Sequence, residues 1–141
     1  MLQQYEHIIG MMGELSYLLP EAMEGFDDMR LAAMLPSDLD PMAKNLVGLG
    51  LAIANGADGW VEHFVIHALQ SGATRPQVVE TIAVSMQVGG AAVLAHGVVA
   101  FETMVEYEAR DRKHAREMMK PSAEPTPPRS PLEAESDTQA A

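Results

Sequence analysis

The segment from Pro41 to Asn55 restricts the fold of this chain more than any other. Asp40 before Pro41 is typical of a helix N-cap followed by a proline in the first turn, and Gly56 can end the helix in a left-handed conformation. From residue 46 to residue 54 the helix is apolar on nearly every side. Because such a helix needs neighbours all around it, we predict that it lies at the centre of an all-α domain.

Helical patterns also cover most of the remaining sequence, and strand patterns are nearly absent. Pro20 ends one helix and opens the next, Asp58 is expected to cap a helix, and Thr74 with Gln77 forms a capping box. The pair Gly89-Gly90 breaks the last apolar stretch. We therefore predict about six helices in one domain, residues 1–120, with helices at about 3–19, 20–35, 41–55, 58–72, 74–89 and 91–119.

Charge and composition exclude several classes of function. The chain of 141 residues has a formal net charge of −11, and phosphate binding needs a basic face, so no nucleic-acid partner is expected. The absence of cysteine excludes a thiol nucleophile and a cysteine zinc site. The N-terminal sequence lacks the basic and apolar regions of a signal peptide, and we expect a cytoplasmic protein.

The run from Ile82 to Phe101 is about as long as a membrane span and contains no Asp, Glu, Lys or Arg. It lacks the aromatic and basic anchors of a membrane interface and includes His96 and the two glycines. We therefore interpret it as two buried helices and expect no membrane association.

Residues 121–141 have a different composition, rich in Pro, Ser, Thr, Glu and Ala. Such a segment has too little apolar surface to form a core. We predict that it is a disordered, acidic, Pro-rich tail.

Several short segments occur in a characteristic order: Lys44-Asn45-Leu46, Ala54-Asn55-Gly56, Ala68-Leu69, Gly72-Ala73-Thr74-Arg75, Val79-Glu80-Thr81-Ile82 and the Gly-Gly break. Their order and spacing resemble the AhpD-like / carboxymuconolactone decarboxylase family over about residues 19 to 107. The resemblance implies a helical bundle that assembles as a trimer or hexamer, with pockets near the subunit contacts. Self-association is therefore the expected protein partnership.

The redox chemistry of that family depends on side chains that this sequence lacks. Redox members carry a Glu, a Cys-x-x-Cys pair and a His, and the resemblance places these positions on Asn45, Ala57, Trp60 and Phe64. Thiolate attack on a peroxide needs sulfur, so we expect no thiol peroxidase activity. These four positions are expected to form a pocket in which carbon rings fill the space of the redox centre.

The decarboxylase branch of the family works without cysteines, on an acidic lactone. The segment with Arg and His that is characteristic of that branch is not evident here, and Lys44 and Arg75 are almost the only cations in the predicted core. Decarboxylation is therefore a minor alternative.

Trp60, His63, Phe64 and His67 fall on one face of the predicted fourth helix. The two histidines are the candidate catalytic groups, because neutral imidazoles can exchange protons with a substrate. Their i,i+4 spacing also allows them to bind a metal if a third ligand converges, and His96 is the best candidate. A transition metal is thus one candidate cofactor, whereas simple packing of the histidines is the alternative interpretation.

Two functional hypotheses remain. In the first, the protein is a cysteine-free enzyme that acts on a small, largely apolar molecule through the histidines, with Trp60 and Phe64 shaping the pocket. In the second, it is a non-catalytic oligomeric binding or scaffold protein that keeps the fold. Convergence of His63, His67 and His96 on one cavity would favour the first hypothesis.

Overall fold

The computed structural model describes residues 2–119, so the predicted tail at 121–141 lies outside the described residues. The fold is all-helical, as predicted. Its elements are α1 (Leu2–Leu18), α2 (Pro20–Met34), α3 (Pro41–Ala54), α4 (Asp58–Gln70), α5 (Arg75–Gly89), the short 3₁₀ helix η1 (Gly90–Val93) and α6 (Leu94–Met118).

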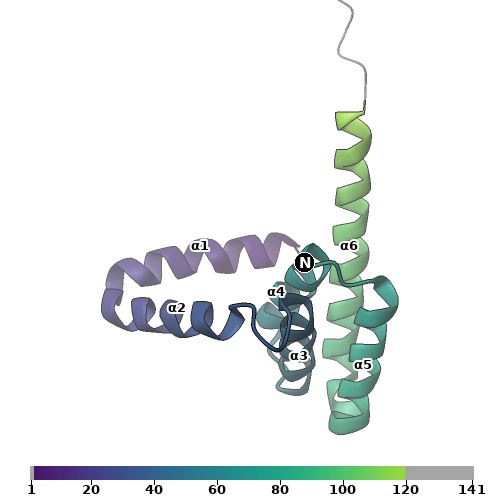
Figure 1. The fold of residues 1–141 in the computed structure, drawn as a ribbon, viewed down its shortest axis with the longest axis horizontal. Coiled ribbons are helices and arrows are strands. Elements are labelled where there is room, and N and C mark those ends of the chain that lie inside the picture. The colour runs from purple at the N-terminus through teal and green to yellow at the C-terminus, as the bar shows by residue number, and fades with distance from the viewer. Residues whose placement is uncertain (1, 120–141) are drawn as a thin grey trace, which may run out of the picture.

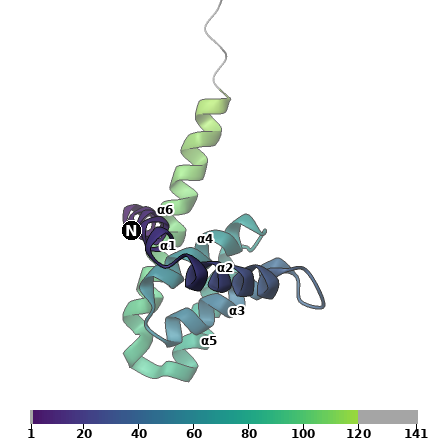
Figure 2. The ribbon, with the colours of Figure 1, turned by 90° about the vertical axis from the view of Figure 1, so that its left-hand side faces the viewer.

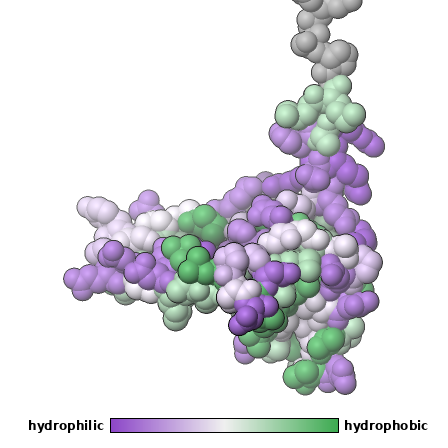
Figure 3. All heavy atoms as spheres, in the orientation of Figure 1, coloured by the Kyte–Doolittle hydropathy of each residue, from purple (hydrophilic) through white to green (hydrophobic). Residues whose placement is uncertain are grey.

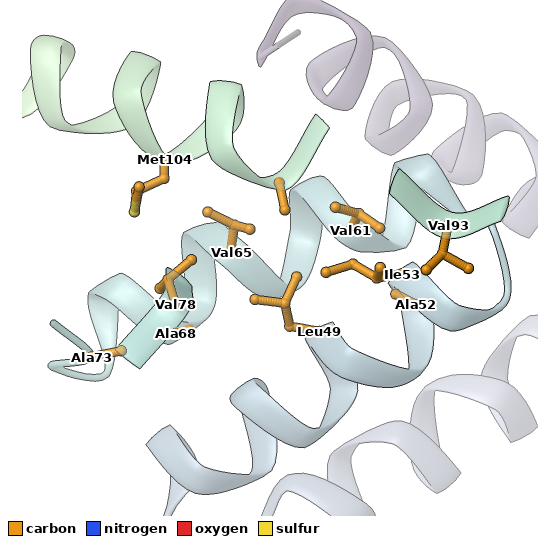
Figure 4. Packing of buried hydrophobic residues seen from close by; sticks show 11 residues of the cluster. Leu49, Ala52, Ile53, Val61, Val65, Ala68, Ala73, Val78, Val93 and Met104 are labelled. Atoms are coloured by element: carbon orange, nitrogen blue, oxygen red, sulfur yellow. The ribbon is translucent and has the colours of Figure 1, made fainter. Parts of the chain in front are cut away.

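The core lies between α3, α4, α5 and α6. Helix α3 contributes Leu49 and Ile53 to it, but Val47 and Leu51 on its other face are more than half exposed. The prediction that neighbours surround this helix on all sides was therefore wrong. Figure 4 shows Leu49 and Ile53 of α3 facing Val61 and Val65 of α4, with Met104 of α6 above them. All five side chains are fully buried. Removing apolar surface of this size from water contributes about 1.5–3 kcal/mol for each large side chain, so this cluster supplies much of the stability of the bundle.

The helix ends follow the sequence signals at three of these four predicted positions. The Asp40 carboxylate accepts a hydrogen bond from the Ala43 amide at 2.7 Å, and Gly56 has a φ of 67°. Thr74 forms the full capping box with Gln77. Asp58 was predicted to be an N-cap, and this was wrong: Ala57 is the cap residue and makes no side-chain cap, whereas Asp58 is the first helical residue.

The apolar run 82–101 is not one straight helix. Gly90 has a φ of 63°, and η1 turns the chain so that α5 and α6 lie side by side and antiparallel (Figure 1). By length and composition, residues 75–118 are nevertheless apolar enough to cross a membrane, and 22% of their most apolar window is buried. The absence of membrane association therefore stays a prediction.

Helices α1 and α2 form a hairpin that projects sideways from the four core helices (Figures 1 and 2). The hairpin reaches the core mainly through α1, which packs against α4 and touches α6. No residue of α2 is buried. The second helix is therefore attached to the domain by its partner α1 and by a small number of side-chain contacts.

Apolar surface is exposed on the hairpin and at the lower end of the α5–α6 pair, where Figure 3 shows green patches. Tyr17 and Leu18 in α1, and Val88 in α5, are more than two-thirds exposed. Exposed apolar patches mark surfaces used in association. The predicted trimer or hexamer is consistent with this surface and stays a prediction.

Candidate functional site

The candidate site is built on one face of α4. The rings of Trp60, Phe64 and His67 all contact the ring of His63, on the common face that the helical spacing predicted. Centroid distances are 5.2 Å for Trp60–His63, 5.1 Å for His63–Phe64 and 4.2 Å for His63–His67. The structure thus forms a continuous wall of two aromatic rings and two imidazoles.

The α1–α2 hairpin covers this wall. From α1, the Tyr5 hydroxyl lies 3.2 Å from Nδ1 of His63. From α2, the Phe26 ring lies 6.0 Å from Trp60. These contacts hold the two helices over α4. Two hollows remain between the hairpin and the core helices.

The first hollow, which we call the histidine cavity, has a volume of about 550 Å³. Its imidazole wall is formed by His63 and His67, beside Tyr5. The facing wall from α1 is apolar and consists of Ile8, Ile9 and Met12. The cavity therefore combines space for a small molecule with hydrogen-bonding groups on one side, which is the usual composition of a ligand pocket.

The second hollow, which we call the aromatic cavity, has a volume of about 420 Å³ and is bounded by α2, α3 and α4. Ala57, Trp60 and Phe64 line it together. That these positions correspond to the cysteines and histidine of redox members stays a prediction from the resemblance. Trp60 and His63 line both cavities and form the wall between them.

The imidazoles in this wall are electrically neutral at pH 7. Burial, together with smaller contributions from the nearby His67 and Arg30, lowers the pKa of His63 to about 4. Burial also lowers the pKa of His67, again with a contribution from Arg30. For Tyr5, burial raises the pKa, so its hydroxyl keeps its proton. The wall therefore offers uncharged donors and acceptors and not a cationic cluster.

Asn45, predicted to belong to the pocket, lies outside both cavities. Its buried amide group donates to the His67 carbonyl at 3.4 Å and to the Ser71 hydroxyl at 3.2 Å. Among the described residues nothing donates to its carbonyl oxygen. Asn45 therefore supports the end of α4 beneath His67 and does not face a ligand.

The predicted three-histidine metal site is not assembled. Nδ1 of His96 lies 2.6 Å from the Asp58 carboxylate, at the N-terminal end of α4, while His63 and His67 face the hairpin. Within residues 2–119, no three His, Asp or Glu side chains converge as metal ligands. His96 is instead paired with Asp58, a long-range contact that no pattern in the sequence indicates.

Glu62 lies on another face of α4 from the histidines and lines neither cavity. Its side chain is 1% exposed, and within the described chain its Oε2 atom has no hydrogen-bond partner. Burial raises the pKa of this carboxyl group, and the charges of Asp58 and Glu106 raise it further, against a lowering hydrogen bond from the Tyr5 backbone. Glu62 is thus a buried acid beside the N-terminal end of α1 and outside both cavities.

Sequence reasoning missed Tyr5 and Arg30. No motif or spacing in the sequence links either residue to α4, because only the folded hairpin brings them there. The two cations that were considered serve other purposes. Lys44 donates to the carbonyl oxygens at the end of α2, and Arg75 binds Glu108 at 2.6 Å.

A third hollow, of about 520 Å³, lies between α3 and α5. Its lining is apolar with a few neutral or acidic side chains, and it contains no imidazole or guanidinium group. We therefore place the candidate site at α4, where cavity space and ionisable groups coincide.

Known proteins share both this sequence pattern and this fold. The sequence profile of the carboxymuconolactone decarboxylase family matches residues 20–103. The chain belongs to this family. An uncharacterised protein from Cupriavidus necator is 33% identical over 78 residues, which are 55% of this chain and 69% of the relative.

Two solved structures of carboxymuconolactone decarboxylase family proteins have a similar fold. One, in its apo form, is from Legionella pneumophila: it has a TM-score of 0.70 and 26% identity, and the match covers 74% of this chain and 96% of that one. The other, from Thermotoga maritima, has a TM-score of 0.63 at 23% identity, with 65% and 95% of the two chains covered. The family assignment made from the segment order is confirmed, and this member contains no cysteine.

Proposed function

We propose that this carboxymuconolactone decarboxylase family protein binds a small, largely apolar molecule in the histidine cavity. The observation that carries the proposal is the pairing of an apolar α1 wall with the Tyr5–His63–His67 wall around about 550 Å³. An apolar body is stabilised by leaving water, and the neutral imidazoles satisfy its polar atoms. Thiol peroxidase chemistry is no part of the proposal, because the chain has no cysteine.

Binding can be tested with the neutral dye N-phenyl-1-naphthylamine. Trp60 is the single tryptophan of the chain and lines the cavity, so energy transfer from its indole reports a dye bound nearby. We expect saturable dye emission accompanied by loss of Trp60 emission. Ile9→Phe, which fills the cavity from α1, should weaken both signals.

The matched control is Val88→Phe, which adds a similar bulk to an exposed apolar residue that lines the hollow between α3 and α5. This variant should bind the dye as the unaltered protein does. Equal loss in both variants, or no effect of Ile9→Phe, would place the bound dye elsewhere and contradict the proposal.

A catalytic role is the second candidate, favoured by the contiguous chain from Tyr5 through His63 to His67. A base with a pKa of about 4 is always available at pH 7 but is weakly basic, and acid–base catalysis is most efficient when the pKa lies near the working pH. The catalytic candidate therefore predicts modest rates that stay constant from pH 5 upward.

The base-sensitive ring opening of 5-nitrobenzisoxazole tests this role with a small aromatic substrate. If His63 acts as a base, the rate exceeds that in buffer and falls to the buffer level in His63→Leu. The control His7→Leu alters an exposed histidine on α1 and should leave the rate unchanged. A rate at the buffer level in the unaltered protein would support the non-catalytic binding hypothesis.

A further inference from the structure

We propose that the preferred ligand is a hydrophobic monocarboxylate and that Arg30 binds its carboxylate at the junction of the two cavities. This inference rests on the proposed binding function and specifies its ligand class. It arises from the one guanidinium group that α2 brings to the site.

Arg30 lines both the histidine cavity and the aromatic cavity, so its head group lies where the two spaces adjoin. Its Nε atom donates to the Asp27 carboxylate at 3.3 Å. Within residues 2–119, no acceptor engages the two terminal amino groups of Arg30. The planar guanidinium therefore keeps two free donors in the fixed geometry that matches a carboxylate.

The positive charge of Arg30 acts on Tyr5, His63 and His67 in the wall of the histidine cavity. That charge contributes to lowering the pKa of His63 and of His67, and it opposes the rise that burial causes in the pKa of Tyr5. Asp27 lies on the histidine cavity but does not line the aromatic cavity. No carboxylate of the described chain lines the aromatic cavity, so an anion is favoured on that side of Arg30.

The rest of the site suits an apolar body attached to that anion. Phe26, Met29 and Trp60 surround Arg30 on the aromatic side, and they can cover rings or alkyl groups that leave water. A second negative charge on the ligand would meet Asp27 or the apolar lining, both of which disfavour it. The combination therefore selects a single acidic group on an otherwise hydrophobic molecule.

The inference can be tested by comparing 2-naphthoate with 2-naphthamide, which have nearly the same shape and differ in charge. Isothermal titration calorimetry with the full chain measures each affinity directly. A charge-assisted bidentate contact corresponds to roughly 10- to 100-fold in affinity, so we expect 2-naphthoate to bind about tenfold or more tightly than 2-naphthamide. Arg30→Gln should remove this preference, so that the affinity for 2-naphthoate falls to that for 2-naphthamide.

Two further variants make the test specific. Arg112→Gln removes the same charge from an exposed position on α6 and should keep the preference, which separates local recognition from net charge. Arg30→Lys keeps the charge without the planar fork and should keep part of the preference.

Equal affinity for the two naphthalenes, or a preference that survives Arg30→Gln, would overturn the inference while leaving the apolar binding function standing. Binding of neither naphthalene, together with no binding of N-phenyl-1-naphthylamine, would overturn both.

Discussion

Replacing Gly48 by alanine sets two opposing effects against each other at one position of α3. Alanine is favoured over glycine inside a helix by about 1 kcal/mol. A Cβ atom at Gly48, however, would lie 2.4 Å from Cε1 of Phe64, 2.6 Å from Cζ and 2.7 Å from Cδ1. The ring also packs against Trp60 and His63, so moving it aside would disturb these ring contacts.

Overpacking of this kind costs about 1–3 kcal/mol. Gly48→Ala should therefore leave the free energy of unfolding unchanged or lower it by up to about 2 kcal/mol after the gain in helix propensity. The control is Gly25→Ala in α2, where an added Cβ has no atom within 4 Å. That variant should be stabilised by roughly 0.5–1 kcal/mol.

Urea denaturation followed by circular dichroism, at one fixed protein concentration, measures the contrast between the two variants. In a Phe64→Ala background the obstructing ring is absent, so Gly48→Ala should become stabilising, and the double-mutant cycle should show a coupling of about 1–3 kcal/mol. If Gly48→Ala stabilises the unaltered protein as much as Gly25→Ala does, Phe64 does not lie over Gly48. The wall of the aromatic cavity formed by these two residues would then be contradicted.

Three further outcomes follow from the ionisable and capping groups. Glu62→Gln should raise the free energy of unfolding at pH 7 by about 1–3 kcal/mol, because it removes a buried charge. The pKa of Glu62 is raised in the folded protein, so this gain should shrink as the pH falls toward 4.5 and the carboxyl group is protonated. A gain that persists at pH 4 would contradict this reasoning. The His63 ring should titrate near pH 4 by NMR. Because the unfolded chain binds a proton on His63 at higher pH than the folded chain does, the free energy of unfolding should fall as the pH drops from 6.5 to 4. An NMR midpoint near 6.5 would show that the ring is exposed. Thr74→Ala should lower the free energy of unfolding by about 1 kcal/mol, measured by urea denaturation, since it removes half of the capping box of α5; no loss would mean that the box is dispensable.

The sequence predicted the helices well because their limits depend on local chemistry. Asp40, Thr74 and Gly56 each satisfy or release backbone groups within one turn, and their effects do not depend on distant residues. Asp58 has the same local chemistry as Asp40, yet its carboxylate is engaged by His96 from 38 residues away. A local rule could not predict that competition.

The candidate site was predictable only where it lies on a single helix. The common face of Trp60, His63, Phe64 and His67 follows from the geometry of α4 alone, and the ring contacts bear it out. Tyr5 and Arg30 reach that face only because the α1–α2 hairpin folds across it. Their roles depend on the angle between hairpin and core, which no periodicity in the sequence encodes.

The exposed character of α2 has a consequence for how this protein can change over evolutionary time. The helix contributes Phe26, Met29 and Arg30 to the cavity walls, yet none of its residues is buried. Surface positions tolerate substitution with little loss of stability. Substitutions in α2 can therefore change the lining of both cavities while the core of α3, α4, α5 and α6 stays the same.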